Sequence, residues 1–291
     1  MALTRIDHVM ICVPDLKAGI ETYRRLGFDV HYGGVHPGGG TENAIAFFED
    51  DYLELLSIRP GEQAQAGAAL VEFIARGGGL RYLAVQSDDL AGDVSAMRRR
   101  GVEVSDPTDG ARQTPAGTEL RWRAARLGAS HALPIFFIEH VTSLAERRRQ
   151  VPHPIEHPNG VLRPERAYIA VADVAKAADV YARVLGMPLP RIERGTVIKA
   201  NMAVFNVGPT GLTVAEPVEP GPAADALANR GPGPFQVLFR TRSMDAAERW
   251  MREHGVPTPA RGIRNTGERA MLVPPCDACG VSIGLAGPAV P

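Results

Sequence analysis

The stretch that decides the fold is PDLKAGIETYRRLGFDV, residues 14–30, because the chain repeats it. Residues 88–104, DDLAGDVSAMRRRGVEV, carry an aspartate and a glycine at the same spacing as Asp15 and Gly27. In both copies the aspartate stands where a helix N-cap belongs, and apolar residues recur at helical spacing. The glycine then ends the helix in the left-handed conformation. The repeat therefore predicts one supersecondary unit that is used more than once.

Two further copies of this unit follow in the second half of the chain. They are residues 172–189, ADVAKAADVYARVLGMPL, and a weaker copy at residues 243–258, SMDAAERWMREHGVPT. A strand-like run precedes each helix, and a short strand and two longer strands follow it. The expected fold is therefore α+β, with four βαβββ modules paired into two domains that each have a cupped, mostly antiparallel sheet.

The boundary between the two pairs is expected where the composition changes, at residues 146–162. We therefore predict an amino-terminal domain over residues 1–145, a linker over 146–162 and a carboxy-terminal domain over 163–291. A chain of 291 residues fits two domains of ordinary size.

The composition excludes several classes of partner. Lys+Arg number 32 and Asp+Glu 33, a balance that argues against nucleic acid or an anionic membrane and favours a small-molecule ligand. Charges at Arg5 and Asp7 interrupt the amino terminus, so we expect no signal peptide or membrane span and a cytoplasmic location. Three cysteines argue against a disulfide framework. The oligomeric state is left open, with a homodimer as one arrangement.

The repeat and three local stretches together resemble a known superfamily. The stretches are residues 33–58, which include GGVHPGGGTENAIAF and YLELLSI, residues 133–140, LPIFFIEH, and residues 157–161, HPNGV. They resemble the vicinal oxygen chelate superfamily, also called the glyoxalase/bleomycin-resistance/extradiol-dioxygenase fold, in its glyoxalase-like branch. The resemblance implies a cup between paired modules and a divalent metal ion, Zn, Mn, Fe or Mg, held by the first and last strands of those modules.

Three metal ligands are implied by this resemblance. They are His8 in the first strand, Glu54 in the last strand of the first module and Glu139 in the last strand of the second module. Where a second histidine is common, this chain has Tyr82, whose ordinary pKa near ~10 favours hydrogen bonding to a substrate over metal ligation. Glu54, Glu139 and Tyr82 are the candidate catalytic residues.

The physical argument for a cation leaves one alternative open. Strand alternation places His8 on one face with apolar residues, and Asp7 on the other. Carboxylates and an imidazole on apolar faces are destabilising unless they are paired, protonated or metal-bound. A divalent ion would satisfy His8, Glu54 and Glu139 together. Ion pairs between the glutamates and an arginine would leave a metal-free pocket instead; the candidate arginines are Arg81, Arg121 and Arg123.

The expected substrate-binding residues come from the lid and the aromatic walls of the cup. The glycine-rich stretch HPGGGTENA, residues 36–44, suits a lid, with Thr41 and Asn43 hydrogen-bonding the substrate. His36 within it fits a turn residue better than a lid acid or base. Trp122 and Phe137 are expected to line the cup.

The carboxy-terminal pair is predicted to be metal-free. Its first-strand ligand positions fall at Arg166 and Gln236, and its last strands offer one glutamate only, Glu216, at a strand end. The resemblance places the iron of extradiol dioxygenases in this pair, so the departure counts against ring cleavage.

Three functions therefore compete. The first is a metal-dependent glyoxalase-like enzyme of the lyase, isomerase or hydrolase type. It would act on a small oxygen-rich or aromatic metabolite through bidentate chelation to the metal. The second is a metal-free protein that binds or sequesters a small molecule, of the bleomycin-resistance kind. The third is an Fe(II) dioxygenase.

Overall fold

The helix signals in the sequence act as predicted. The structure is a computed structural model that describes residues 3–131, 133–151, 154–258 and 260–288. The four repeated helices are α1 (Leu16–Arg25), α4 (Leu90–Arg99), α6 (Val174–Leu185) and α8 (Met244–Glu253). Each begins with a side-chain cap, in which a backbone N–H of the first turn donates to Asp15, Asp89, Asp173 or Ser243. The remaining helices are α2 (Gln63–Ala66), α3 (Ala68–Ala75), α5 (Leu144–Arg148) and α7 (Pro222–Arg230).

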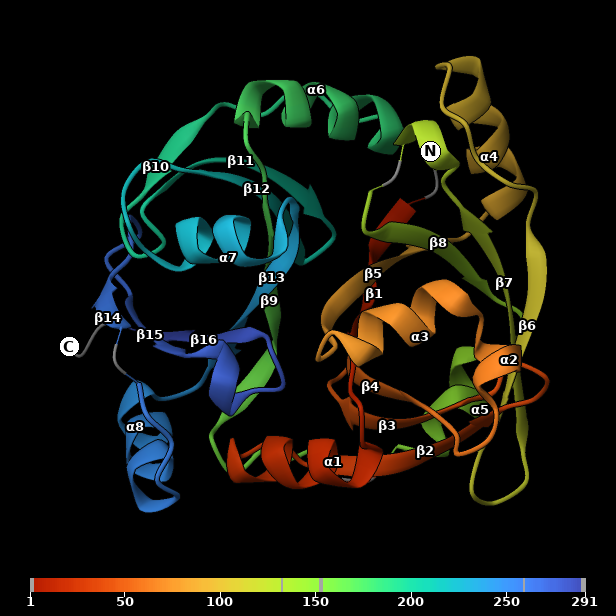
Figure 1. Ribbon diagram of the computed structural model, residues 1–291, viewed down its shortest axis with the longest axis horizontal. Helices are drawn as coiled ribbons and strands as arrows, with labels where there is room; N and C mark the ends of the chain where they lie inside the picture. Colours follow the sequence, from red (N-terminus) through yellow and green to blue (C-terminus); the bar gives the residue numbers. More distant parts are fainter. Residues whose placement is uncertain (1–2, 132, 152–153, 259, 289–291) are drawn as a thin grey trace.

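The strands form two curled eight-stranded sheets that lie side by side (Figure 1). The amino-terminal sheet consists of β1 (Leu3–Cys12), β2 (Val30–His36), β3 (Thr41–Phe47), β4 (Tyr52–Ile58), β5 (Gly79–Ser87), β6 (Thr108–Gln113), β7 (Glu119–Arg126) and β8 (Ile135–His140). The carboxy-terminal sheet consists of β9 (Val161–Ala170), β10 (Glu193–Gly195), β11 (Ala200–Val207), β12 (Thr210–Pro217), β13 (Gly233–Thr241), β14 (Ala260–Ile263), β15 (Arg269–Val273) and β16 (Ser282–Gly287). The predicted architecture of four modules paired into two cupped domains is confirmed.

Most strand pairs are antiparallel, as expected. The parallel pairs join the first and last strands of each module: β1 with β4, β5 with β8, β9 with β12 and β13 with β16. The amino-terminal sheet goes further than a cup, because β2 meets β6 at Val35 and Gln113 and closes it into a barrel. Gly34 permits this closure, since a Cβ there would lie 1.8 Å from the Gln113 carbonyl oxygen.

One irregularity recurs in all four modules. β1 and β5 are antiparallel, and their register skips Asp7 on β1 and Arg81 on β5. β9 and β13 repeat the pattern, with skips at Glu165 and Phe235. Such a β-bulge adds a residue to one strand and re-aims its side chain. As a result Arg81 and Tyr82, neighbours in sequence, line the same cavity.

The interiors of the two sheets differ. An apolar cluster lies within the carboxy-terminal sheet, with members on β9, β11, β12, β13 and α7. The corresponding cluster of the amino-terminal barrel has only three fully buried members, Ala84, Phe136 and Ile138. The amino-terminal barrel keeps a hollow of about 550 Å³, while two hollows lined by residues of the carboxy-terminal half are smaller, at about 260 and 340 Å³.

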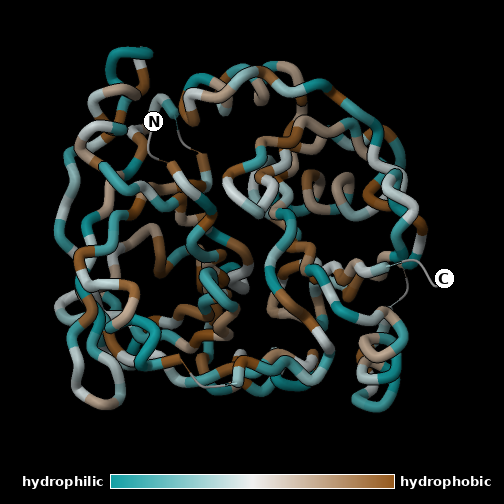
Figure 2. The backbone as a smooth tube through the Cα atoms, turned by 180° about the vertical axis from the view of Figure 1, so that it is seen from behind, coloured by the Kyte–Doolittle hydropathy of each residue, from teal (hydrophilic) through white to brown (hydrophobic). Residues whose placement is uncertain are grey.

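One hydrophobic core continues through both halves on the outer sides of the sheets. At the seam Phe28 packs edge-on against Phe239 with 4.9 Å between ring centroids, and the Trp250 indole donates to the Arg25 carbonyl oxygen. The backbone seen from behind in Figure 2 shows apolar stretches recurring along the strands of both halves. The predicted linker 146–162 begins inside α5 and ends where β9 begins, so its bounds stay a prediction.

Candidate functional site

The principal cavity lies in the amino-terminal barrel and has a volume of about 550 Å³. We call it the cup cavity. All eight strands of the barrel contribute residues to its wall, and residues 66–70 of the α2–α3 segment also line it. Its volume falls in the range of small-molecule sites. Its lining includes His8, Met10, His36, Thr41, Asn43, Tyr52, Glu54, Arg81, Tyr82, Arg112, Trp122, Arg126, Phe136 and Ile138.

His8 is held in the cup cavity by a carboxylate. Its Nδ1 lies 2.8 Å from Asp7 Oδ1, and its ring stacks on Tyr52 with 4.5 Å between centroids. The other oxygen of Asp7 lies 2.8 Å from Nε2 of His140, on β8. Asp7 is fully buried. Burial alone would raise the pKa of Asp7, but hydrogen bonds and charge from His140 and His8 lower it well below its ordinary value.

These contacts determine the tautomer of His8. Because Asp7 is ionised, it accepts hydrogen bonds from both imidazoles, so the proton of His8 next to it sits on Nδ1. The opposite ring nitrogen, Nε2, faces Glu54, whose Oε2 lies 3.6 Å away. Asp7 therefore orients His8 so that Nε2 is directed at a carboxylate of the cup cavity.

Glu54 is the polar centre of the cavity floor. It is buried on β4, and its Oε1 accepts a 2.6 Å hydrogen bond from the Asn43 amide. His36 Nε2 lies 3.9 Å from the same oxygen. Burial lowers the pKa of His36, so its ring is neutral at neutral pH. The lone carboxylate in an apolar strand is thus surrounded by two imidazoles and an amide.

Strand register identifies which residues of the two modules are counterparts. His8 lies opposite Ala84, and Met10 lies opposite Tyr82, along the antiparallel β1–β5 pair. A pseudo-twofold axis between these strands therefore equates His8 with Tyr82 and Met10 with Ala84. The resemblance had placed Tyr82 at the counterpart of His8, and its ring does line the cup cavity.

The counterpart of Glu54 differs from the expected residue. Along the parallel pairs Met10 aligns with Glu54, and Ala84 aligns with Phe136. Because Met10 and Ala84 are counterparts, Phe136 occupies the position equivalent to Glu54. An aromatic side chain thus lines the cavity where a second carboxylate was expected.

Glu139 and Phe137 lie away from the cup cavity, which corrects their predicted placement. Along β8 both side chains lie on the face of the strand opposite to that of Phe136. Glu139 forms a 2.8 Å ion pair with Arg123 of β7, and Phe137 is fully buried in the outer core. The sequence correctly groups Phe137 and Glu139 on one face of β8, but the cavity is lined by the opposite face, which carries Phe136 and Ile138. The arginine pairing considered as the alternative for Glu139 is the arrangement that the structure has.

The remaining predicted substrate residues converge on the cup cavity. Thr41, Asn43 and Trp122 line it together with Tyr82. His36 also lines it, with its Nδ1 3.0 Å from the Thr41 hydroxyl, so it is more than a turn residue. Whether any of them contacts a substrate stays a prediction.

The divalent metal implied by the resemblance does not fit the side chains that meet here. Two of the four counterpart positions hold Tyr82 and Phe136, and Glu139 is directed elsewhere. His8 Nε2 lies 3.6 Å from one oxygen of the Glu54 carboxylate, and His36 Nε2 lies 3.9 Å from the other. Within residues 3–131, 133–151, 154–258 and 260–288, no group of three or more His, Cys, Asp or Glu residues is arranged to hold a metal ion.

Sequence reasoning missed Asp7 and His140. Strict alternation assigned Asp7 to the face opposite His8, but the bulge at Asp7 changes its direction. His140 follows Phe136 and Ile138 in the inward alternation of β8 and reaches Asp7 from there. The available signal was the even spacing of Phe136, Ile138 and His140, which separates this face from that of Glu139.

A second, smaller hollow borders the cup cavity. It measures about 60 Å³ and shares Tyr52, Arg112 and Trp122 with the cup cavity. We call it the inner cavity. His140 and Asp51 line it beneath α5. Burial, followed by the charge of Asp7, raises the pKa of Asp51 to about 7.

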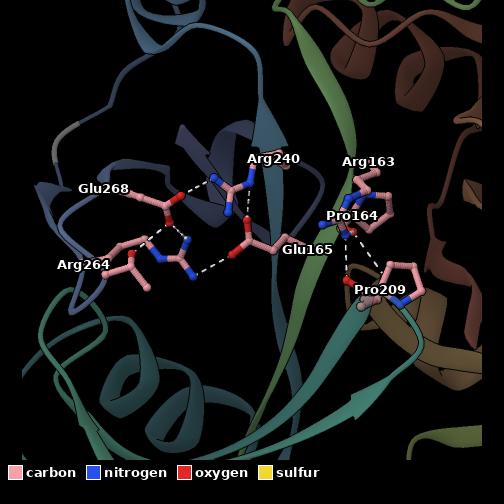
Figure 3. Close-up of polar contacts among 9 residues, drawn as sticks. Arg163, Pro164, Glu165, Pro209, Arg240, Arg264 and Glu268 are labelled. Atoms are coloured by element: carbon pink, nitrogen blue, oxygen red, sulfur yellow. Dashed lines mark hydrogen bonds and ion pairs between the residues drawn. The ribbon is translucent and has the colours of Figure 1, made fainter. Parts of the chain in front are cut away.

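The carboxy-terminal half uses the same bulge position differently. Glu165, the bulge residue of β9, pairs with Arg240 at 2.8 Å and with Arg264 at 2.7 Å (Figure 3). Glu268 completes the network by pairing with both arginines. Where Asp7 orients an imidazole toward a cavity, Glu165 belongs to a closed set of ion pairs. The prediction that this half holds no metal is untested.

The sequence matches two family models. The model described as "Glyoxalase-like domain" matches residues 6–185, more than half of the chain. The model described as "Glyoxalase/Bleomycin resistance protein/Dioxygenase superfamily" matches residues 167–272. No curated protein matches the sequence. Among the described residues, no helix has the length and apolar character needed to cross a membrane.

Solved structures share the fold at low sequence identity. A hypothetical protein from Staphylococcus aureus is similar with a TM-score of 0.69 at 13% identity, over 99% of this chain and 100% of that chain. A mutant of 4-hydroxymandelate synthase from Streptomyces coelicolor is similar with a TM-score of 0.67 at 16% identity, over 99% and 93%. Methylmalonyl-CoA epimerase from Mycobacterium tuberculosis aligns with 45% of this chain and 91% of its own, at 29% identity and a TM-score of 0.41.

The family model, the four βαβββ modules and the cup of the amino-terminal barrel agree. The chain therefore belongs to the glyoxalase-like domain family, within the vicinal oxygen chelate superfamily.

Proposed function

We propose that this protein is an enzyme that moves a proton on a small oxygen-containing substrate bound in the cup cavity. The observation that carries the proposal is the order Asp7–His8–Glu54. A buried carboxylate fixes an imidazole, and the free nitrogen of that imidazole lies 3.6 Å from a second carboxylate inside a ligand-sized hollow. Paired acid–base groups at one point of a cavity are typical of proton-transfer sites.

The roles follow from the contacts. Glu54 is the base that takes a proton from the substrate, and His8 Nε2 is the neighbouring atom with which Glu54 shares that proton before returning it. Asp7 is a positioning residue, since it contacts His8 and not the hollow. Tyr82 lines the same cavity, and we assign its hydroxyl the donation of a hydrogen bond to a substrate oxygen. A base held in this way contributes about 10²–10⁴-fold to a rate.

The proposed reaction is of the isomerase or lyase type expected from the sequence, but it does not require a metal ion. The metal-dependent form expected from the resemblance rests in this chain on His8 and Glu54 and stays a prediction. The binding-protein alternative has one observation in its favour, the largely aromatic and aliphatic wall made by Met10, Trp122 and Phe136.

The test compares two glutamates on opposite sides of the barrel wall. The protein is incubated in D₂O with a panel of small carbonyl compounds, and NMR follows exchange of the hydrogen next to the carbonyl. We expect Glu54→Gln to slow exchange about 10²-fold or more. Glu139→Gln is the matched control, because Glu139 pairs with Arg123 outside the cavity, and it should keep the wild-type rate.

Three outcomes are informative. Exchange that survives Glu54→Gln would contradict the proposed base. Equal losses in both glutamate variants would show a structural effect in place of a chemical one. Tight binding of panel compounds by the wild type, with no exchange of any of them, would favour the binding-protein alternative.

A further inference from the structure

A third hollow, distinct from the inner cavity, adjoins the cup cavity. It measures about 370 Å³ and lies between β5, β7 and β8 of the barrel and residues 232–234 at the start of β13. We call it the side cavity. Arg81, Tyr82 and Arg126 line both the side cavity and the cup cavity. These three residues therefore form the boundary between the two spaces, which we call the gate.

Both arginines of the gate rest on aromatic rings. The Arg81 guanidinium carbon lies 4.6 Å from the Phe73 ring centroid and 5.2 Å from that of Tyr82. The Arg126 guanidinium carbon lies 5.6 Å from the Tyr82 centroid and 5.0 Å from that of Phe136. Such cation–π contacts hold a guanidinium plane without using its N–H donors. The donors of both groups are therefore left for another partner.

That partner is not supplied by the described part of the chain. Within it, neither guanidinium has a hydrogen bond or an ion pair, in contrast to Arg123 and Arg112 nearby. The described lining of the side cavity has no other charged residue than these two arginines. Two like charges near one ring repel each other, so an anion placed between them is stabilised by both.

We propose that the gate recognises an oxyanion, a phosphate or a carboxylate, carried by a ligand whose apolar body lies in the cup cavity. The planar fork of a guanidinium fits both kinds of oxyanion. Tyr82 lies opposite Met10, two residues along β1 from His8, so such a ligand reaches from the gate to the acid–base groups. The inference rests on the proposed function, because it names the substrate class of the same site: an anionic compound with a planar or aromatic portion.

The gate depends on the bulge at Arg81. Regular alternation would direct Arg81 away from Tyr82, but the skipped register between β1 and β5 brings both to the cavity wall. This bulge is the counterpart of the one at Asp7. One module thus uses the bulge to orient the His8 imidazole, and the other uses it to present a cation.

The test measures binding of four probes by calorimetry: phenyl phosphate, benzoate, inorganic phosphate and the neutral benzyl alcohol. The wild type should bind phenyl phosphate or benzoate at least tenfold more tightly than benzyl alcohol. The double variant Arg81→Gln/Arg126→Gln should lose at least tenfold of that affinity and keep its affinity for benzyl alcohol. Arg123→Gln is the matched control on β7 and should bind all four probes as the wild type does.

Each result decides one part of the proposal. The tighter of phenyl phosphate and benzoate identifies the oxyanion. Equal affinity for charged and neutral probes, or full anion binding by the double variant, would overturn the proposal, as would no binding by the wild type. Inorganic phosphate binding as tightly as phenyl phosphate would overturn the requirement for an apolar body. Because no turnover is measured, intact anion binding without hydrogen exchange would count against the proposed function alone.

Discussion

A single buried carboxylate sets the chemistry of the cup cavity. Asp7 has no exposed surface, yet it stays ionised because two imidazoles donate to it. An unpaired charge at that depth would be strongly destabilising. His8 and His140 therefore stabilise Asp7, and Asp7 in turn fixes the direction of His8. The His8 ring is held from one side by Asp7 and from one face by Tyr52, which leaves Nε2 toward Glu54.

A neighbouring carboxylate behaves in the opposite way. Burial raises the pKa of Asp51 from 3.8 to about 7, so its ionised form is disfavoured in the folded protein. The unfolded chain loses that proton near pH 4 and the folded chain near pH 7. The destabilisation therefore grows as the pH rises from about 4 to about 7 and stays constant above that.

Asp51→Asn should remove this destabilisation. We expect the variant to exceed the wild type in free energy of unfolding by about 1–4 kcal/mol at pH 8, since one pKa unit corresponds to about 1.4 kcal/mol. The gain should nearly disappear at pH 4. Urea denaturation at both pH values measures it, with Asp179→Asn as control because Asp179 is exposed on α6, away from the charges that raise the pKa of Asp51. An Asp51→Asn protein that is no more stable at pH 8 would refute the assignment.

At the scale of elements, glycines and bulges determine where the polar groups meet. Gly34 lets β2 meet β6 and close the barrel, and Gly33 makes room for Asn43, whose amide holds Glu54. Arg112 crosses from β6 to donate to the Gly33 carbonyl oxygen. Gly33 and Gly34 are therefore needed to bring the polar groups around Glu54 together.

Gly33→Ala should displace Asn43 and weaken its hydrogen bond to Glu54. A Cβ at Gly33 would lie 2.3 Å from Asn43 Oδ1, a distance that forces the amide to move. We expect a loss of about 1–3 kcal/mol in free energy of unfolding, as for other overpacked cores. The same substitution in an Asn43→Ala background should be much less harmful, because the clashing atom is gone. Equal losses in both backgrounds, measured by urea denaturation, would show that Asn43 does not fill this space.

The limits of sequence reasoning are also visible at this scale. The Asp and Ser caps and the helix-ending glycines are local signals, and they predicted all four modules. The resemblance predicted Glu54 at the cavity, the glycine-rich stretch predicted Thr41 and Asn43, and the expected aromatic wall predicted Trp122, and all four line it. Alternation failed at Asp7, where a bulge that depends on the partner strand β5 re-aims the side chain. On β8 the alternation was right, but only its pairing with β5 reveals which face is inward.

At the scale of the whole molecule, duplication has given two halves with different interiors. The amino-terminal barrel holds acid–base groups in a hollow of about 550 Å³. The carboxy-terminal half has an apolar cluster and smaller hollows of about 260 and 340 Å³, and its bulge glutamate is closed into ion pairs. Contacts across the seam join both halves through one core. The carboxy-terminal half therefore supports the barrel and borders the side cavity at residues 232–234.

The two modules of the amino-terminal barrel also differ from each other, and this difference leads to a prediction about metal content. Since Tyr82 and Phe136 stand at two of the four counterpart positions, we expect protein purified without chelator to contain much less than one divalent ion per chain. Elemental analysis measures this, with His8→Ala as the comparison, and both proteins should give the same low value. A stoichiometric ion in the wild type that is lost in His8→Ala would instead support the metal-dependent reaction implied by the resemblance.

The most direct test of the Asp7–His8–Glu54 arrangement is the ¹⁵N NMR spectrum of the histidine side chains at pH 7.5, with the His8→Asn variant used to assign the His8 signals. The contact with Asp7 predicts that Nδ1 of His8 carries the proton, so that Nε2 is the atom offered to Glu54. A His8 ring with a bare Nδ1 in the folded protein would contradict the arrangement and, with it, the proposed role of Glu54.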